Sequence, residues 1–219
     1  MTSPLHWPRR SGAGVLALAL IVLMQGCTLN QPAPVKHTYL LETSRAQAVG
    51  KPAHADALLV AAFRVAEPFA GKGMVYRFDE YRYESDFYNE FFVTPRDIMT
   101  QRVLQWLQSA ALFDSVRLSA GSARRDALQL DGLVTEMYGD IRDPQQPRAV
   151  LAVQFYVTRT DRTGTEVLFA QQLSQSVAMP DTSAASLAAG LSQALQAVLT
   201  ELESQLRVAP LPERDPKAE

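Results

Sequence analysis

The chain of 219 residues contains a single cysteine, Cys27, and only three histidines. One thiol cannot form an intramolecular disulfide, and a zinc site needs three or four ligands. The sequence therefore predicts neither a disulfide nor a structural zinc site. His6 lies in the N-terminal segment, and we expect His37 and His54 to be solvated because no second ligand stands at metal-binding spacing. The patterns G-x-S-x-G, G-x-G-x-x-G and the P-loop are also absent. No catalytic, metal or cofactor site is predicted.

An excess of charge of one sign is lacking as well. Lys and Arg number 21 against 23 for Asp and Glu, which gives a formal net charge of −2, and the basic residues form no long run. Without a basic field, nucleic-acid binding is excluded as a function class. A hydrophobic content of 47% and a charged content of 20% are ordinary for a globular domain with a core.

No apolar run reaches the length of about 18 residues that a transmembrane helix requires. The run 13–24 would form a helix about 18 Å long, against a hydrocarbon core of about 30 Å. Arg9 and Arg10 precede it, and the small residue Gly26 follows it. This layout predicts a secretory signal over residues 1–26, and a buried N-terminal helix is the alternative.

The end of this signal, Leu23-Met24-Gln25-Gly26-Cys27, resembles a bacterial lipobox, with Met24 where leucine is usual. The resemblance implies cleavage between Gly26 and Cys27, and acylation of Cys27 with a diacylglyceryl thioether and an amide-linked chain such as palmitate. Several acyl chains anchor a protein stably, whereas one does so only marginally. Thr28, where aspartate would imply the inner membrane, implies the periplasmic face of the outer membrane.

Composition divides the remainder into three parts. Residues 27–36 contain Pro32 and Pro34 and are predicted to be an acylated N-terminus with an extended tether. Residues 37–208 carry the periodic apolar patterns of one folded domain. Residues 209–219 have three prolines and mixed charge, so we expect a disordered tail.

Within the domain, the apolar pattern predicts strands and two helices. The first helix begins with Thr94 as N-cap and Pro95 at the first position. The second covers 182–207, and both helices have one apolar stripe that should pack on a sheet. The predicted fold is therefore α+β, with a mostly antiparallel or mixed sheet and a bulge at Gly132. Strands are expected at 38–42, at the start of 57–69, in a bent or paired segment at 73–93, and at 115–118, 127–141, 149–160 and 165–177.

Five carboxylates fall in twelve residues and could do acid–base work: Asp79, Glu80, Glu84, Asp86 and Glu90. Arg77 and Arg82 lie among them, and alternating charges of this kind are typical of a solvated strand edge.

The same segment holds eight of the eighteen aromatic residues between positions 76 and 92. Alternation in a strand cannot bury all of them on one face. We expect Phe78, Phe91 and Phe92 in the core. Tyr81, Tyr83 and Tyr88 fit either the core or a protein-facing surface, since exposed aromatics are enriched in interfaces.

The order of these elements, with "YLL", "YNEFF", "QWL" and "YGDIRD", resembles the ABC-type transport auxiliary lipoproteins over nearly all of 38–207. The resemblance implies a non-enzymatic lipoprotein of a lipid-transport system. Its implied partners are an ABC permease and ATPase and a periplasmic protein of the mammalian-cell-entry class, whose bridge it would dock at the outer membrane. Ring-like or other homo-oligomers would suit that role.

Two other function classes stay open at this point. A lipoprotein of a secretion or envelope-assembly machine could have the same α+β build. An anchored hydrolase would use the carboxylates in 79–90.

Overall fold

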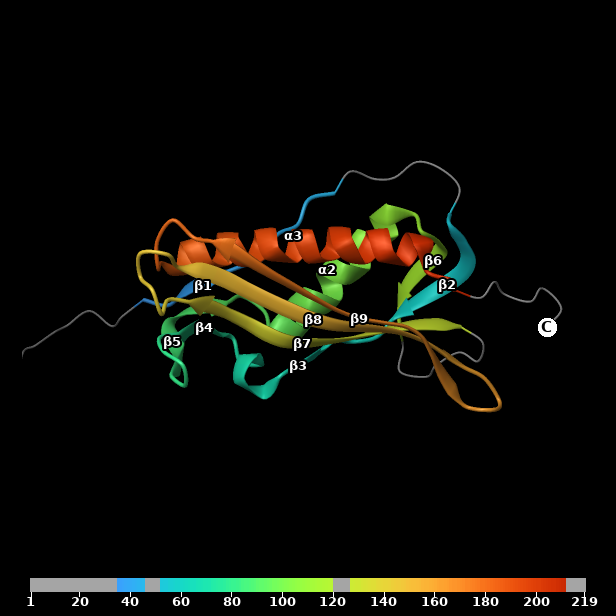
Figure 1. The fold of residues 1–219 in the computed structure, drawn as a ribbon, viewed down its shortest axis with the longest axis horizontal. Coiled ribbons are helices and arrows are strands. Elements are labelled where there is room, and N and C mark those ends of the chain that lie inside the picture. Colours follow the sequence, from blue (N-terminus) through green and yellow to red (C-terminus); the bar gives the residue numbers. More distant parts are fainter. Residues whose placement is uncertain (1–34, 46–51, 120–126, 212–219) are drawn as a thin grey trace, which may run out of the picture. The chain divides into compact units, whose positions relative to one another are not determined.

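The computed structural model describes residues 35–45, 52–119 and 127–211, which form a mixed sheet carrying two helices (Figure 1). The expected α+β class is confirmed. The predicted signal, Cys27 and nearly all of the tether fall in 1–34, outside the described residues. In chain order the elements are β1 (His37–Tyr39), β2 (His54–Val60), β3 (Arg64–Val65), the 3-10 helix η1 (Glu67–Phe69), β4 (Gly73–Arg77), β5 (Tyr83–Phe91), α2 (Pro95–Ala110), β6 (Phe113–Leu118), β7 (Leu128–Asp140), β8 (Arg148–Thr160), β9 (Thr165–Ala178) and α3 (Ala184–Val208).

Strand β7 is the centre of the sheet. Along one edge it pairs antiparallel with β8, which in turn pairs antiparallel with β9. Along the other edge it pairs in parallel with β2, β3 and β4 in succession. β6 extends β2, while β5 and then β1 extend β4. Most of these pairings are parallel, so the sheet is mixed rather than mostly antiparallel.

Both helices pack on the sheet, α3 over β8 and β9, and α2 against β2, β3 and β6 (Figure 1). Their predicted apolar stripes are confirmed as core. In α2 the buried positions include Met99, Val103, Trp106, Leu107 and Ala110, and in α3 they include Leu187, Leu191, Leu195, Val198, Leu202 and Leu206. α3 approaches the sheet closely, because a Cβ added at Gly190 would lie only 2.7 Å from the Cβ of Ala149.

Polar groups fix the helix ends and the contact between the helices. The Thr94 hydroxyl accepts a hydrogen bond from the backbone N–H of Asp97 at 3.3 Å, which confirms the predicted N-cap. On α3, the Glu203 carboxylate accepts hydrogen bonds from Trp106 Nε1 of α2 at 3.0 Å and from Arg45 at 2.7 Å. The Arg45 guanidinium accordingly lowers the pKa of the Glu203 carboxyl. This junction attaches the segment after β1 to both helices.

The strand expected at the start of 57–69 is confirmed as β2, and the rest of the segment forms β3 and η1. The Phe63 N–H donates to the Thr100 hydroxyl of α2 at 2.9 Å. One expectation about the core is wrong. Gly132 is not a bulge, because the register shift lies between Val134 and Glu136. Gly132 instead leaves room for the Phe63 ring, with which a Cβ would collide.

Two expected solvated features are also packed. His54 belongs to β2, its ring stacks on Phe113 at 5.1 Å between centroids, and its Nε2 lies 2.8 Å from the Leu206 carbonyl oxygen. The start of the tail predicted at 209–219 is also packed, since Leu211 is buried against the core. Residues 212–219 lie outside the described part of the chain. Neither described helix is long and apolar enough to cross a membrane.

The close approach at Gly132 gives a stability prediction. Gly132→Ala should lower the free energy of unfolding by about 1–3 kcal/mol, because the added methyl forces the buried Phe63 ring to move. Gly71→Ala is the matched control: its Cβ would meet no atom within 4 Å, so the change should stay within about 0.5 kcal/mol. Urea unfolding of the two variants measures the difference, and equal effects would contradict this packing.

Candidate aromatic docking surface

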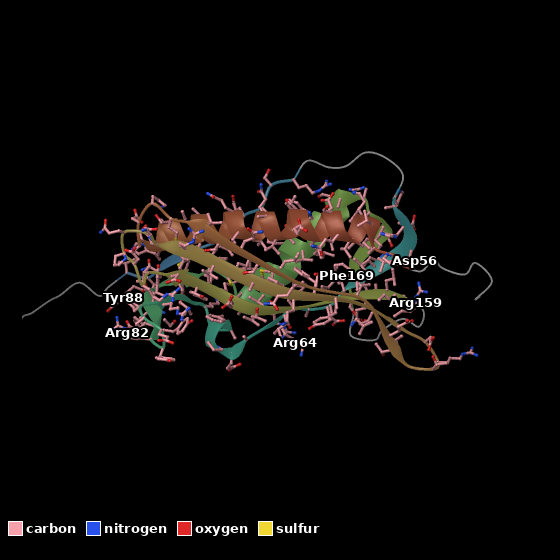
Figure 2. The ribbon with its side chains drawn as sticks, in the orientation of Figure 1. Asp56, Arg64, Arg82, Tyr88, Arg159 and Phe169 are labelled. Carbon is pink, nitrogen blue, oxygen red and sulfur yellow. The ribbon has the colours of Figure 1, made fainter. Side chains whose placement is uncertain are left out.

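The most distinctive surface feature is a group of exposed aromatic side chains on and around β5, which we call the aromatic surface. It consists of Tyr81, Tyr83, Phe87, Tyr88 and Phe92, and these are the exposed Tyr and Phe residues of the described chain. Exposure ranges from 39% for Tyr83 to 86% for Tyr81. Figure 2 shows Tyr88 at one end of the sheet, near Arg82 and far from Arg159.

A tight turn positions Tyr81 between β4 and β5. The Asp79 carboxylate accepts the backbone N–H groups of Tyr81 at 2.9 Å and Arg82 at 2.8 Å, and these bonds lower the pKa of the Asp79 carboxyl. Arg77 donates from Nε to the Asp79 carbonyl oxygen and from Nη2 to that of Glu80, both at 3.1 Å. Arg77 and Asp79 thus hold the turn, while the Tyr81 ring projects into solvent.

Tyr83 is attached to the sheet face opposite α3. Gly139 faces α3, because a Cβ there would lie 3.4 Å from Leu187, so the adjacent Tyr138 points to the other face. There the Tyr138 ring packs edge-on against Tyr83 at 5.4 Å and stacks with Phe69 at 5.8 Å between centroids. Burial raises the pKa of the Tyr138 hydroxyl. Tyr83 is therefore both an exposed side chain and a support of this small cluster.

Phe87 and Tyr88 are displayed by a local distortion of β5. The Asp86 carboxylate accepts the backbone N–H groups of Tyr88 at 2.8 Å and Asn89 at 3.0 Å, and the Asn89 side-chain amide at 2.8 Å. The rings of Phe87 and Tyr88 pack edge to face, with centroids 5.3 Å apart. Lys36 Nζ lies 4.6 Å from the Phe87 centroid and 3.2 Å from Glu90. Both rings are thus held in position before any partner arrives.

Phe92 corrects an expectation, since it was predicted in the core and is 60% exposed. Phe91, the last residue of β5, is buried as expected, and Phe92 follows directly after the strand ends. Phe78, also predicted in the core, is only partly buried, and its ring lies 4.7 Å from the Arg82 guanidinium. A sequence pattern shows which residues share a face, but it does not show which face the rest of the fold covers. The exposure of Phe92 was therefore not predictable from the sequence.

The clustered carboxylates already have partners. Asp79 and Asp86 accept backbone N–H groups, Glu84 lies 3.5 Å from Arg82, and Glu90 pairs with Lys36. Among the described residues no group of three or more His, Cys, Asp or Glu side chains could hold a metal ion. The geometry favours rigid display of aromatic rings over acid–base chemistry.

A cleft of about 550 Å³ lies behind this surface, between β5 and the start of α3. Its lining includes Tyr39, Tyr76, Asp86, Asn89 and Ser183. The Tyr39 hydroxyl donates to the Asn89 side-chain oxygen at 3.4 Å, and burial raises the pKa of the Tyr76 hydroxyl well above its ordinary value. No local sequence pattern indicates this cleft, because its walls come from five separate segments of the chain.

At the other end of the sheet, Asp56 of β2 is buried and lies 3.1 Å from an Arg159 nitrogen of β8 (Figure 2). This pair joins strands on either side of β7. A buried carboxylate that loses its cation destabilises the fold. The ion pair therefore gives both residues a structural role.

The two tyrosines of the β4–β5 hairpin should differ in their effect on stability. Tyr83→Ala removes ring contacts with Phe69 and Tyr138 and should lower the free energy of unfolding by about 1–3 kcal/mol. Tyr81→Ala removes a ring that is 86% exposed and should change it by less than about 0.5 kcal/mol. Chemical unfolding followed by fluorescence tests both. A large loss for Tyr81→Ala would show that this ring supports the fold.

Comparison with known proteins identifies the fold and the family. The structure is similar to the crystal structure of protein XCC0632 from Xanthomonas campestris, described as family-model DUF330, with a TM-score of 0.68, 17% identity, and coverage of 79% of this chain and 96% of that one. It is also similar to the crystal structure of an uncharacterized protein, with a TM-score of 0.61, 14% identity, and coverage of 78% and 99%.

No curated protein sequence matches the chain. The model of the family described as "ABC-type transport auxiliary lipoprotein component" matches residues 39–203, which include all of the aromatic surface. The protein therefore belongs to the ABC-type transport auxiliary lipoprotein components.

Proposed function

We propose that this protein is a non-enzymatic, lipid-anchored component of an ABC-type phospholipid transport system, and that it docks the periplasmic bridge of that system at the outer membrane. The family supports a role beside an ABC transporter. The observation that carries the docking role is the aromatic surface, whose five rings are exposed. A periplasmic protein of the mammalian-cell-entry class is the proposed direct partner, with the ABC permease and ATPase behind it.

The aromatic surface has the chemistry of a protein interface. Tyrosine, phenylalanine and arginine are enriched in interface cores, where they lose their water in fitted pockets. Rings already held in place lose little conformational freedom on binding, so more of the contact energy remains as affinity. Tyr83 is held by Tyr138, and Phe87 and Tyr88 follow the hydrogen-bonded Asp86. We assign Tyr81, Tyr83 and Tyr88 to partner contact, together with Phe87 and Phe92.

The proposed anchor is Cys27, acylated after cleavage behind Gly26. The ten residues from Cys27 to Lys36 reach at most about 35 Å when fully extended. β1 begins at His37 and pairs directly with β5, and Lys36 lies against Phe87. The chain therefore enters the domain beside the aromatic surface, so an acylated Cys27 would keep that surface within a short reach of the membrane.

One experiment tests anchor and docking together. The full-length tagged protein is recovered from envelope membranes in mild detergent, and the proteins that come with it are identified. The wild type should fractionate with the outer membrane and bring a mammalian-cell-entry-class protein. Cys27→Ser should no longer fractionate with the outer membrane, because it lacks the acylated thiol.

The docking variant in that experiment is Tyr81→Ala combined with Tyr88→Ala. It should stay in the membrane and recover at least tenfold less partner, since it removes two exposed rings. Leu118→Ala is the control, because Leu118 is 48% exposed and lies on β6, away from the aromatic surface. Recovery of secretion components instead would support the envelope-assembly alternative. Equal recovery by the double variant and the control would contradict the docking role of these rings.

A further inference from the structure

β9 is a long edge strand, and no described strand pairs with its outer side. It covers Thr165–Ala178, and among the described strands it pairs with β8 alone. An exposed edge offers a row of N–H and C=O groups to another strand, and proteins normally protect such edges with charge, proline or short length. β9 has none of these protections over residues 167–178, which contain no charged residue and no proline.

The other two edges of the sheet are protected. β1 has only three residues, and Lys36 precedes it directly. β6 is six residues long and contains Asp114 and Arg117. The lack of protection is therefore specific to β9.

The pairing with β8 shows which backbone groups of β9 point outward. The Met179 N–H donates to the Pro147 carbonyl oxygen at 2.8 Å, so these two residues face each other in the ladder. Hydrogen-bonded pairs recur at every second residue of an antiparallel ladder, and the register pairs Val177 with Ala149 and Leu173 with Val153. The backbone N–H and C=O groups of the odd-numbered residues from 169 to 177 thus point toward β8. The outward groups belong to Ala170, Gln172, Ser174, Ser176 and Ala178.

Part of this outer row is already occupied. Arg148 donates from Nη2 to the Ser176 carbonyl oxygen at 2.7 Å and from Nε to the Ser176 hydroxyl at 2.6 Å. At the other end, the ladder shifts register beyond Phe169. The open row is therefore Ala170, Gln172 and Ser174, and Gln172 is its midpoint.

We propose that β9 pairs antiparallel with β9 of a second copy of this chain, about a two-fold axis at Gln172. This register is the one that pairs the whole open row: Gln172 faces Gln172 of the second copy, and Ala170 faces Ser174. In a two-fold pair each side chain near the axis lies beside its own equivalent, so a charge there would repel itself. An uncharged strand of Gln, Ser and Ala satisfies that condition.

The surface beside the edge is polar. A groove of about 420 Å³ runs beside β9, and its lining includes Gln175, Gln193, Gln196 and Thr200 together with the two carboxylates Glu42 and Glu201. The amide and hydroxyl side chains can exchange hydrogen bonds with their equivalents across the axis. Two of the segments outside the described residues fit the edge poorly by sequence: 28–34 contains Pro32 and Pro34, and 212–219 is rich in charge and proline.

Disulfide trapping of the full-length protein in mild detergent tests the pairing and its register. Directly opposed residues in a hydrogen-bonded pair have Cα atoms about 5.5 Å apart, within the range of a disulfide. Gln172→Cys should therefore form a covalent dimer with oxidised glutathione at least tenfold faster than Ala170→Cys. In the control, the two copies of residue 170 lie about 14 Å apart across the axis. Both variants retain Cys27, so any contribution of that thiol is the same in each.

A mixture of Ala170→Cys and Ser174→Cys proteins should cross-link to each other and not to themselves. Light scattering of the wild type, corrected for detergent, should give the mass of a dimer or of an assembly of dimers. A monomeric wild type, with Gln172→Cys no faster than Ala170→Cys, would overturn the proposal. Faster self-linking at Ser174 would overturn the register. Neither result depends on which transporter the protein serves.

Discussion

Strand β7 is hydrogen-bonded along both of its edges, and every other strand reaches the sheet through it. β8 takes one edge, while β2, β3 and β4 share the other in succession. The short strands β2, β3 and β4 are thus held in one sheet by the continuous ladder of β7. β5 is joined to β7 by strand pairing only through β4, whose Tyr76 and Arg77 pair with β7. The position of the aromatic surface therefore depends on the end of β7.

The same end of β7 also organises what lies on either face of the sheet. Gly139 faces α3 and leaves room for the Tyr76 ring, while Tyr138 faces the other way and packs with Tyr83. Adjacent residues of one strand thus connect the core beneath α3 to the exposed rings. Cations are interleaved with those rings, as Arg77 lies over Tyr83 and Lys36 over Phe87. A partner would meet a surface that combines rigid apolar area with placed charges.

Much of the fold followed from the sequence, because helix caps and apolar periodicity are local signals. Thr94 and the α3 stripe are examples, since both depend on residues within a few turns of one another. Pairing partners are not local, so the parallel addition of β2, β3 and β4 to β7 was not predictable from periodicity. Gly132 shows the same limit: its role depends on Phe63, which is distant in sequence.

For the candidate site, the sequence identified the segment and part of its surface. Tyr81, Tyr83 and Tyr88 were left between core and surface, and all three are exposed. Phe92, expected in the core, lies just beyond the end of β5 and is exposed. Phe87 was not singled out, since the distortion set by Asp86 breaks simple alternation. Burial of an aromatic residue depends on what covers its face, and that is a property of the whole fold.

The central claim is that the aromatic surface contacts a transporter protein in the envelope. The most direct measurement replaces Phe87 with a photo-crosslinking amino acid in the full-length protein and irradiates intact cells. We expect an adduct with the periplasmic component of an ABC transport system, and no such adduct from the same replacement at Leu118. Adducts with that component from Leu118 alone, or with lipid alone from Phe87, would contradict it.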